Sequence, residues 1–386
     1  MGAMAFAGFI MICYAALLEG FLLTAENNAV GMVTGHFQIH DLGYRDDPDL
    51  YKLINGADPL IAKIEALGHH AAGRLFAFGL AAAGSSSAGV SVRGVDLERE
   101  ITVSRLYQQI MTGKWLDASD PFGVVIGRKL ARTLGVEVGD EMVFVGQAAD
   151  GSMANELYRV RGIFKSVGEG VDRAGFFMLE KTFRELMVLP AGIHEIAILS
   201  GEEGRSLDQQ TAELVALAPG LEVKNWRQLQ PVVARIVDMS QSSLWIMLLV
   251  TYAAVGILTL NGILMSVFER IREFGVMKAL GLSPLTVFSI ITMEAVLQVA
   301  VAIVLASALA IPLSLYGETH PIDLTFLAST SATVAGIAID PVWYCKVTRN
   351  SIVMPIILMF GVTLIAVIYP AAKAALIRPV QAIYYR

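Results

Sequence analysis

The stretch Phe268–Leu285, FERIREFGVMKALGLSPL, is the charged segment around which the chain is organised. It lies between two long apolar runs, so its charged side chains stand out from the sequence on both sides. Apolar residues recur within it at helical spacing, which predicts a short amphipathic helix. These apolar residues are Ile271, Phe274 and Met277.

The end of this helix and the start of the next are also marked in the sequence. Leu280-Gly281 predicts the stop, because glycine readily adopts the left-handed conformation that closes many helices. Ser283-Pro284 predicts an immediate new start, with serine as the N-cap and proline as the first helical residue. A short charged helix is therefore expected to lead directly into an apolar one.

The segment matches the pattern E-R-x-R-E-x-G-V-x-x-A-L-G-A-S at nearly every position, and in this it resembles the cytoplasmic coupling segment of FtsX-like ABC transporter permeases. That family includes the MacB class and the lipoprotein-releasing class. The resemblance implies that 269–285 is the cytoplasmic coupling segment and that a separate ATPase docks on Glu269–Leu282. A charged loop that only fixes the membrane topology is the alternative interpretation. The implied coupling residues are Glu269, Arg270, Arg272, Glu273, Phe274, Met277, Lys278, Leu280 and Gly281.

The composition indicates an integral membrane protein with a sizeable soluble part. Of the 386 residues, 55% are hydrophobic and 17% are charged, whereas soluble globular domains carry about 25% charged residues. The net charge of −6 gives no indication of nucleic-acid binding. There are two cysteines, one in an apolar run and one in a loop, and we do not expect a disulfide between them.

Four apolar runs are long enough to cross a bilayer, which needs about 20 residues. The first run carries no charge up to Leu18 and is assigned to 1–24. A cleaved signal peptide is its alternative interpretation. The other three spans are assigned to about 239–268, 287–317 and 351–372. We thus expect an α-helical membrane protein with four transmembrane helices.

The region 25–237 differs from the four apolar spans, because its apolar runs are short and residues typical of turns recur. Met142–Val145 and Tyr158–Phe164 read as paired strands, and Asp58-Pro59 reads as a helix start. This predicts a large α+β domain inserted between the first and second spans. GHFQIH (35–40) and GRKLARTLGVEVGDE (127–141) resemble the extracytoplasmic, MacB-like core domain of the same family.

The C-terminal region supplies a second match. The ending YPAAKAALIRPVQAIYYR (369–386) resembles the family pattern P-A-x-x-A-A-x-x-x-P-V-x-A-L. The FtsX-like permease domain is therefore assigned to 238–386. Basic residues concentrate in the charged segment and the C-terminal tail, which places both in the cytoplasm and the large domain outside. The resemblance implies the bacterial inner membrane.

No motif for catalysis is present in the sequence. The Walker A pattern G-x-x-x-x-G-K-[ST] does not occur, so we expect no ATP hydrolysis by this chain and no cofactor. His36 and His40 are four residues apart and could ligate a metal, but structural roles are favoured because no cysteine or acidic cluster accompanies them. Glu19 and Glu294 lie near span ends, where each either has a partner or occupies the interface.

Four spans, a domain of this size and no fused ATPase make the chain most similar to the LolC/LolE class. That resemblance implies a permease subunit that works with a cytoplasmic ATPase dimer and a second permease copy or homologue. It also implies a lipoprotein substrate and a periplasmic carrier. A MacB-like efflux permease and an FtsX-like regulator of an envelope enzyme stay open as alternatives. For a lipid-anchored substrate, lateral access is expected at Phe21, Leu22, Leu244 and Met247.

Overall fold

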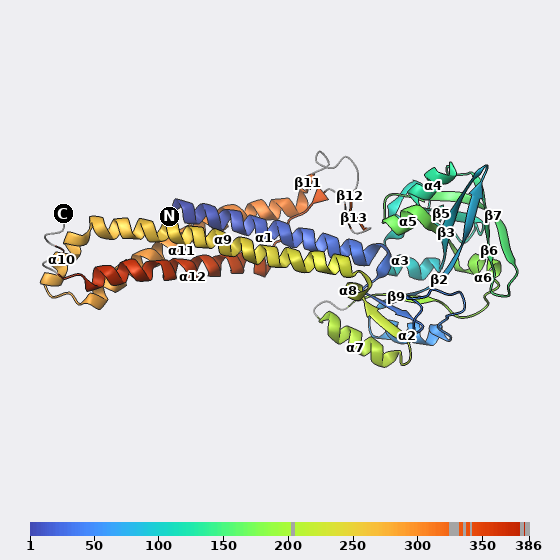
Figure 1. Cartoon of the computed structure of the whole chain (residues 1–386), viewed down its shortest axis with the longest axis horizontal. Helices are drawn as coiled ribbons and strands as arrows, with labels where there is room; N and C mark the ends of the chain where they lie inside the picture. Colours follow the sequence, from blue (N-terminus) through green and yellow to red (C-terminus); the bar gives the residue numbers. More distant parts are fainter. Residues whose placement is uncertain (202–204, 324–331, 335–336, 340–341, 379–381, 383–386) are drawn as a thin grey trace. The chain divides into compact units, whose positions relative to one another are not determined.

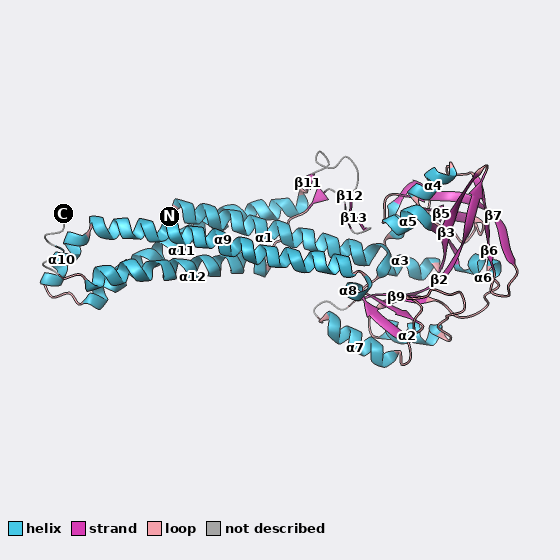
Figure 2. Cartoon of the chain, in the orientation of Figure 1, coloured by secondary structure: helices cyan, strands magenta, loops and turns pink. Residues whose placement is uncertain are grey.

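The computed structural model describes residues 1–201, 205–323, 332–334, 337–339, 342–378 and 382 (Figures 1 and 2). The chain divides into two compact units, which we call the helical unit and the sheet unit. The helical unit consists of Met1–Thr24, Ile236–Leu327 and Val342–Arg386, and the sheet unit consists of Ala25–Arg235 and Ala328–Pro341.

Four long apolar helices make up most of the helical unit. They are α1 (Gly2–Ala29), α9 (Pro231–Glu269), α11 (Pro284–Thr319) and α12 (Arg349–Leu376). Each is long and apolar enough to cross a membrane, as the sequence predicted. The helices extend beyond the predicted spans, and α9 begins at Pro231 rather than near 239. The short helix α10 (Ile271–Ala279) lies between α9 and α11 in the chain.

Small residues allow the helices to pack closely. A core cluster joins Met11 of α1, Tyr252 of α9, Val299 of α11 and Met359 of α12. Gly8 of α1 has no side chain, and this lets α1 approach α11 and α12 closely. A Cβ placed on Gly8 would lie 3.0 Å from the Cβ of Ala306 on α11 and 3.2 Å from the sulfur of Met359 on α12. Close approach of this kind is typical of helices that pack within a membrane. In the connection before α12, β11 (Ile322–Asp323) pairs with β14 (Val342–Trp343).

A ten-stranded sheet forms the sheet unit. Its order is β10-β1-β9-β2-β3-β8-β5-β7-β4, and β6 pairs with both β2 and β7. Strands β2, β3, β8, β5, β7 and β6 therefore close into a ring. The strands are β1 (Phe37–His40), β2 (His70–Ala83), β3 (Ser86–Val95), β4 (Ile110–Gly113), β5 (Gly123–Ile126), β6 (Glu141–Gln147), β7 (Met153–Phe164), β8 (Gly175–Leu179), β9 (Glu195–Leu199) and β10 (Glu222–Asn225).

Aromatic side chains fill the space inside this ring. The rings of Phe144 and Tyr158 lie 6.0 and 5.7 Å from that of Phe176, and all three side chains are buried. The predicted pairing of β6 with β7 is confirmed, with Met142 opposite Tyr158. A short antiparallel pair, β12 (Ala332–Val334) with β13 (Ile337–Ile339), is separate from the large sheet.

Short helices connect the strands of the sheet unit. The predicted start at Asp58-Pro59 is wrong by two residues, because Gly56 rather than Asp58 is the N-cap, with a left-handed φ of 66°. Asp58 and Pro59 therefore lie in the first turn, where both residue types are favoured. The helices are α2 (Ala57–Ala66), α3 (Leu97–Val103), α4 (Arg128–Leu134), α5 (Glu169–Ala174), α6 (Glu180–Leu186), α7 (Leu207–Leu217), α8 (Trp226–Leu229) and the single turns η1 (Val30–Thr34) and η2 (Leu106–Gln109).

A buried ionic network joins three neighbouring strands, β1, β9 and β2, to helix α3. The guanidinium of Arg74 on β2 donates to both oxygens of Glu100 on α3, at 2.9 and 2.7 Å, and to Glu195 on β9 at 2.9 Å. Glu195 also accepts a hydrogen bond from Nε2 of His40 at 3.1 Å. All four side chains are buried, so each charge depends on its partners rather than on water.

Burial in this region also shifts two pKa values. Burial alone would raise the pKa of Glu195, but the hydrogen bond from His40 and the charge of Arg74 lower it to about 2. The neighbouring His194 has its pKa lowered to about 4, chiefly because burial disfavours the charged imidazolium. Its neutral ring accepts the Phe76 N–H at 3.1 Å and lies 3.1 Å from the Leu50 carbonyl oxygen.

The depressed pKa of His194 predicts acid sensitivity of the sheet unit. Between about pH 6.5 and 4 the unfolded chain binds a proton at this ring and the folded chain does not, so stability falls as the pH falls. We expect His194→Gln to flatten the loss of unfolding free energy over that window. Urea unfolding of the full chain, followed by Trp115 and Trp226 fluorescence after the other tryptophans are replaced, measures it.

His70→Gln is the matched control, because His70 is exposed on the same sheet. That variant should keep the wild-type dependence on pH. Equal slopes for the His194 and His70 variants would contradict the assignment of the acid sensitivity to His194.

A candidate coupling site in the helical unit

The charged segment folds as the sequence predicts. In α10, the Gly281 N–H donates to the Lys278 carbonyl and the Leu282 N–H donates to the Met277 carbonyl, both at 3.1 Å, with Gly281 at φ 102°. This pair of bonds is the Schellman motif that closes a helix at a left-handed residue. The next helix, α11, begins at Pro284 with Ser283 as its N-cap, so the predicted stop and start are both confirmed.

Phe274 attaches α10 to three other helices. Its side chain is 1% exposed and lies in a core cluster with Ile263 of α9, Ile291 of α11 and Ala371 of α12. Phe274, one of the predicted coupling residues, therefore has its side chain in the core rather than on the surface of the segment. Its apolar surface is already covered by the chain's own helices.

Lys278 forms a second attachment, to the C-terminal end of α12. Its Nζ donates to the carbonyl oxygens of Ala375 and Ile377, each at 2.6 Å. The last carbonyls of a helix have no partner within the helix, and a lysine satisfies them while complementing the negative end of the helix dipole. This contact joins the two stretches of sequence that carry the family resemblance.

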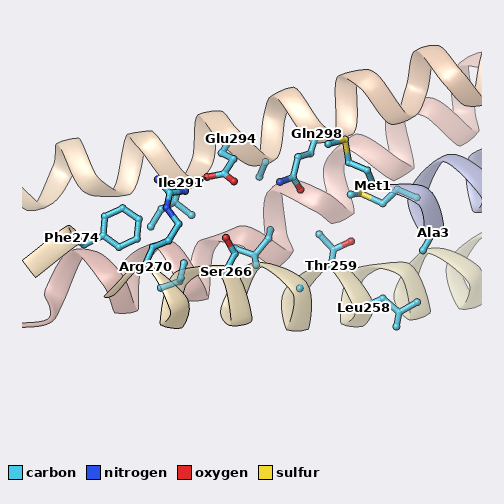
Figure 3. A pocket seen from close by; sticks show the side chains of 15 residues that line it. Met1, Ala3, Leu258, Thr259, Ser266, Arg270, Phe274, Ile291, Glu294 and Gln298 are labelled. Carbon is cyan, nitrogen blue, oxygen red and sulfur yellow. Dashed lines mark hydrogen bonds and ion pairs between the residues drawn. The ribbon is translucent and has the colours of Figure 1, made fainter. Parts of the chain in front are cut away.

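Arg270 forms a third attachment, between the end of α9 and α11. Its guanidinium lies 3.1 Å from Glu294 and 3.2 Å from Glu273, and 5.4 Å from the centre of the Phe274 ring. Glu294, whose role the sequence left open, is thus paired with the charged segment (Figure 3). Both members of the Arg270–Glu294 pair are about 40% exposed, at 40% and 42%, so the pair fixes geometry more than it adds stability.

A cavity of about 120 Å³ lies beside this ion pair, between α1, α9 and α11 (Figure 3). Its polar lining consists of Thr259, Ser266, Arg270, Glu294 and Gln298. Such a lining can hold water between helices that are otherwise apolar. Sequence reasoning did not single out Thr259, Ser266 or Gln298. The sequence does indicate a shared polar face on each helix, because Thr259 and Ser266 are seven residues apart on α9, and Glu294 and Gln298 are four residues apart on α11.

The remaining face of α10 is exposed. Val276 is 49% exposed and Leu280 is 81% exposed, and Arg272 and Glu273 are also exposed. Met277 is half-buried against the Phe274 cluster. The segment therefore presents a mixed apolar and charged surface on a helix whose opposite face is fixed.

The four residues predicted for lateral access differ in exposure. Leu22 is 7% exposed, Phe21 is half-buried with its ring 5.2 Å from that of Trp343, and Leu244 is half-buried. Met247 on α9 is 45% exposed. Of the four, Met247 is therefore the most exposed side chain.

The histidines considered as metal ligands have structural hydrogen bonds. Nδ1 of His36 accepts the Ser200 N–H at 3.0 Å, and His40 pairs with Glu195. Burial, together with the nearby His69, lowers the pKa of His36, which keeps its ring neutral. Within the described residues, no group of three or more His, Cys, Asp or Glu side chains is arranged to hold a metal ion.

Comparison with known proteins finds a family model and relatives that match this chain. Residues 245–379 match the family model "FtsX-like permease C-terminal". The chain is 22% identical over 309 residues to the lipoprotein-releasing system transmembrane protein LolC of Xylella fastidiosa, in strains Temecula1 and 9a5c. Each match covers 76% of this chain and 72% of the relative.

The similar solved structures include a periplasmic region and an extracellular domain. The periplasmic region of MacB from Actinobacillus actinomycetemcomitans is 13% identical, with a TM-score of 0.38, covering 54% of this chain and 95% of that one. The extracellular domain of the ABC-type transporter YknZ from Gram-positive bacteria is 12% identical, with a TM-score of 0.36, covering 49% and 98%.

The helical unit thus contains an FtsX-like permease domain, and its charged segment and C-terminal helix lie inside the matched region. Over 309 residues the chain is also similar to LolC.

Removal of the Phe274 side chain tests whether this residue is structural. Phe274→Ala should destabilise the helical unit by about 3 kcal/mol or more, because it leaves a cavity between α10 and three other helices. Val276→Ala, two residues away on the exposed face, should have little effect. Thermal unfolding of the detergent-purified chain measures both variants. Similar midpoints for the two would contradict the core assignment.

Proposed function

We propose that this chain is the permease subunit of an ABC transporter that couples ATP hydrolysis by a separate cytoplasmic ATPase to movements of the sheet unit. The observation that carries the proposal is the attachment of α10 to α9, α11 and α12 through Phe274, Lys278 and Arg270. A force applied to the exposed face of α10 would reach three membrane helices at once. In this proposal the protein resides in the bacterial inner membrane, with the sheet unit in the periplasm.

The ATPase would dock on the exposed face of α10. Exposed apolar residues beside charged ones, here Val276 and Leu280 beside Arg272 and Glu273, fit the composition of a protein interface. Nucleotide-driven closure of the ATPase dimer would favour one of two arrangements of the spans. A second permease copy would face the first, so that the two sheet units move relative to each other.

The substrate proposed is a lipoprotein held in the membrane by its acyl chains. The similarity to LolC supports this choice, and the apolar, exposed surfaces of the spans suit an acyl chain better than a polar solute. Burial of an acyl chain is worth about 0.8 kcal/mol per CH₂ group, so extraction needs an energy source. The chain would release the lipoprotein to a periplasmic carrier.

The docking proposal predicts that exposed α10 residues determine ATPase affinity. Val276→Asp and Leu280→Gln should each weaken association with the ATPase at least tenfold, because interface anchors typically contribute about 2 kcal/mol or more. Binding of the purified ATPase to the full chain in nanodiscs measures the effect. Thermal unfolding should be unchanged, since neither side chain is buried.

Arg349→Glu is the matched control, because this exposed residue begins α12 at the end of that helix opposite to Lys278. It should bind the ATPase as the wild type does. Wild-type affinity in both α10 variants would place the docking surface elsewhere on the chain.

The substrate proposal predicts contact with a lipid anchor at the access residues. A photo-crosslinker at Met247 should capture a lipoprotein in the nucleotide-free complex, and ATP should release it. Crosslinkers at Phe21, Leu22 and Leu244 should capture less, because these side chains contact the chain itself. Mass spectrometry of the adducts identifies what is bound.

Leu248 provides the control, because it is adjacent to Met247 but 1% exposed. Equal capture of the same substrate without its lipid would contradict lipoprotein release. Adducts limited to small amphipathic compounds would favour an efflux permease instead.

A further inference from the structure

A cavity of about 300 Å³ lies in the sheet unit, at the point where the chain leaves α1. Its walls come from the end of α1, from η1, from the end of α3 and the residues that follow it, and from β9. We call it the junction cavity. Its volume falls at the lower end of the range for pockets that hold small ligands, roughly 300–1,000 Å³. Its polar lining includes Asn27, His36, Ser104, Arg105, Tyr107 and Gln108.

Arg105 supplies the positive charge of the junction cavity. Its backbone N–H donates to the Gly31 carbonyl at 2.8 Å. Because Gly31 has no side chain, Nε of Arg105 comes within 3.8 Å of the position that a Cβ would occupy there. The arginine is exposed, and no carboxylate of the described residues pairs with it. A guanidinium without an acidic partner is well suited to hold a phosphate, because its N–H groups match two phosphate oxygens at once.

Two neutral groups add hydrogen-bond donors. Nδ1 of His36 accepts the Ser200 N–H at 3.0 Å, so the neutral ring carries its proton on Nε2. That N–H has no partner in the part of the chain that the structure describes. The Tyr107 hydroxyl accepts a hydrogen bond from the Gln108 amide at 2.8 Å, which leaves its own proton available for an acceptor. Both side chains can therefore donate to an anion that Arg105 holds.

The charge balance of the junction cavity favours an anion. Among the described residues that line it, none is acidic. Ser104 donates to the Glu100 carboxylate at 2.7 Å. That carboxylate is paired with Arg74, so it does not offset the charge of Arg105. A phosphate, which carries negative charge on several acceptor oxygens, matches a lining of one cation and uncharged donors.

The position of the cavity along the chain indicates the source of the phosphate. Asn27 lies three residues beyond Thr24, the end of the predicted span, in the same continuous helix. Three residues of helix rise about 4.5 Å, and the headgroup layer on each side of a bilayer is about 5–7 Å thick. With the sheet unit outside the membrane, Asn27 is at the depth of the outer headgroups, where the phosphates of phospholipids lie.

We propose that the junction cavity binds the phosphate of an anionic phospholipid from the outer leaflet. Arg105 pairs with the charge, and His36 and Tyr107 donate to the phosphate oxygens. A lipid bound there fixes the end of α1 at the membrane surface. This inference rests on the proposed function in one respect, since it needs the sheet unit to lie outside the membrane. The lipid is a ligand of the permease and is distinct from the lipoprotein substrate.

Photo-crosslinking of a lipid headgroup tests the site. The full chain is placed in nanodiscs of zwitterionic phosphatidylcholine that contain a small share of phosphatidylglycerol with a photoreactive group on its headgroup. Mass spectrometry should find adducts within 101–108. Arg105→Gln should lower their yield about fivefold, the factor that corresponds to about 1 kcal/mol for one basic residue at an anionic membrane surface. Arg105→Lys should retain most of the yield.

Tyr107→Phe tests a neutral donor, because it removes the hydroxyl and keeps the ring. It should lower the yield about two- to tenfold, as expected for one hydrogen bond. Arg132→Gln is the matched control, because this exposed arginine lies on α4, outside the cavity. It should leave the yield unchanged. Equal yields for the Arg105→Gln and Arg132→Gln variants would overturn the proposal, as would adducts confined to other segments.

Two further measurements separate the alternatives. Thermal unfolding in phosphatidylcholine nanodiscs should be the same for Arg105→Gln and the wild type. A lower midpoint together with an unchanged adduct yield would make Arg105 a structural residue and overturn the proposal. Inorganic phosphate and glycerophosphoglycerol serve as soluble competitors. If either suppresses the adducts as well as unlabelled phosphatidylglycerol does, the cavity binds a soluble phosphate and the assignment to a lipid is wrong. None of these readouts needs ATP, the ATPase or a lipoprotein, so their failure is distinguishable from failure of the transport proposal.

Discussion

The burial of Phe274 is the constraint on which the helical unit depends. A helix of nine residues, the length of α10, has little stability of its own in water. It persists because Phe274 fills a space between α9, α11 and α12, and because Lys278 and Arg270 attach its two ends to α12 and α11. The charged surface of α10 is thus held in a fixed position by apolar packing beneath it. A helix attached in this way can transmit a displacement rather than absorb it.

The sheet unit depends on a different kind of interaction. Arg74, Glu100 and Glu195 are charges that the fold has removed from water, and such a group contributes little net stability while its partners are present. Loss of one partner would leave an uncompensated buried charge, which costs far more. The network therefore favours one arrangement of β2, β9 and α3 over alternatives. The ring of strands is held by apolar packing, whereas the attachment of β1 and β9 to it involves buried ions.

Local features were predictable from the sequence, because they depend on neighbouring residues. The Schellman stop at Gly281, the N-cap at Ser283 and the pairing of β6 with β7 all follow from turn and capping chemistry. The contacts of Lys278 with Ala375 and Ile377 could not be predicted, since nearly a hundred residues separate the partners. Periodicity showed that Phe274 lies on an apolar face, but it does not say whether the chain or another protein covers that face.

The length of α9 bears on how the proposed coupling would work. At 1.5 Å per residue its 39 residues span about 58 Å, well beyond the roughly 30 Å of a hydrocarbon layer. The helix continues from Pro231 to Glu269 without a break, so it passes the division between the two units at Ile236. The proline of α9, Pro231, is the first residue of the helix, where it does not disturb helical hydrogen bonds. In the proposed transporter, a tilt imposed near Glu269 would therefore move the far end of α9 further than the near end, and the length of the helix would enlarge a small displacement at α10.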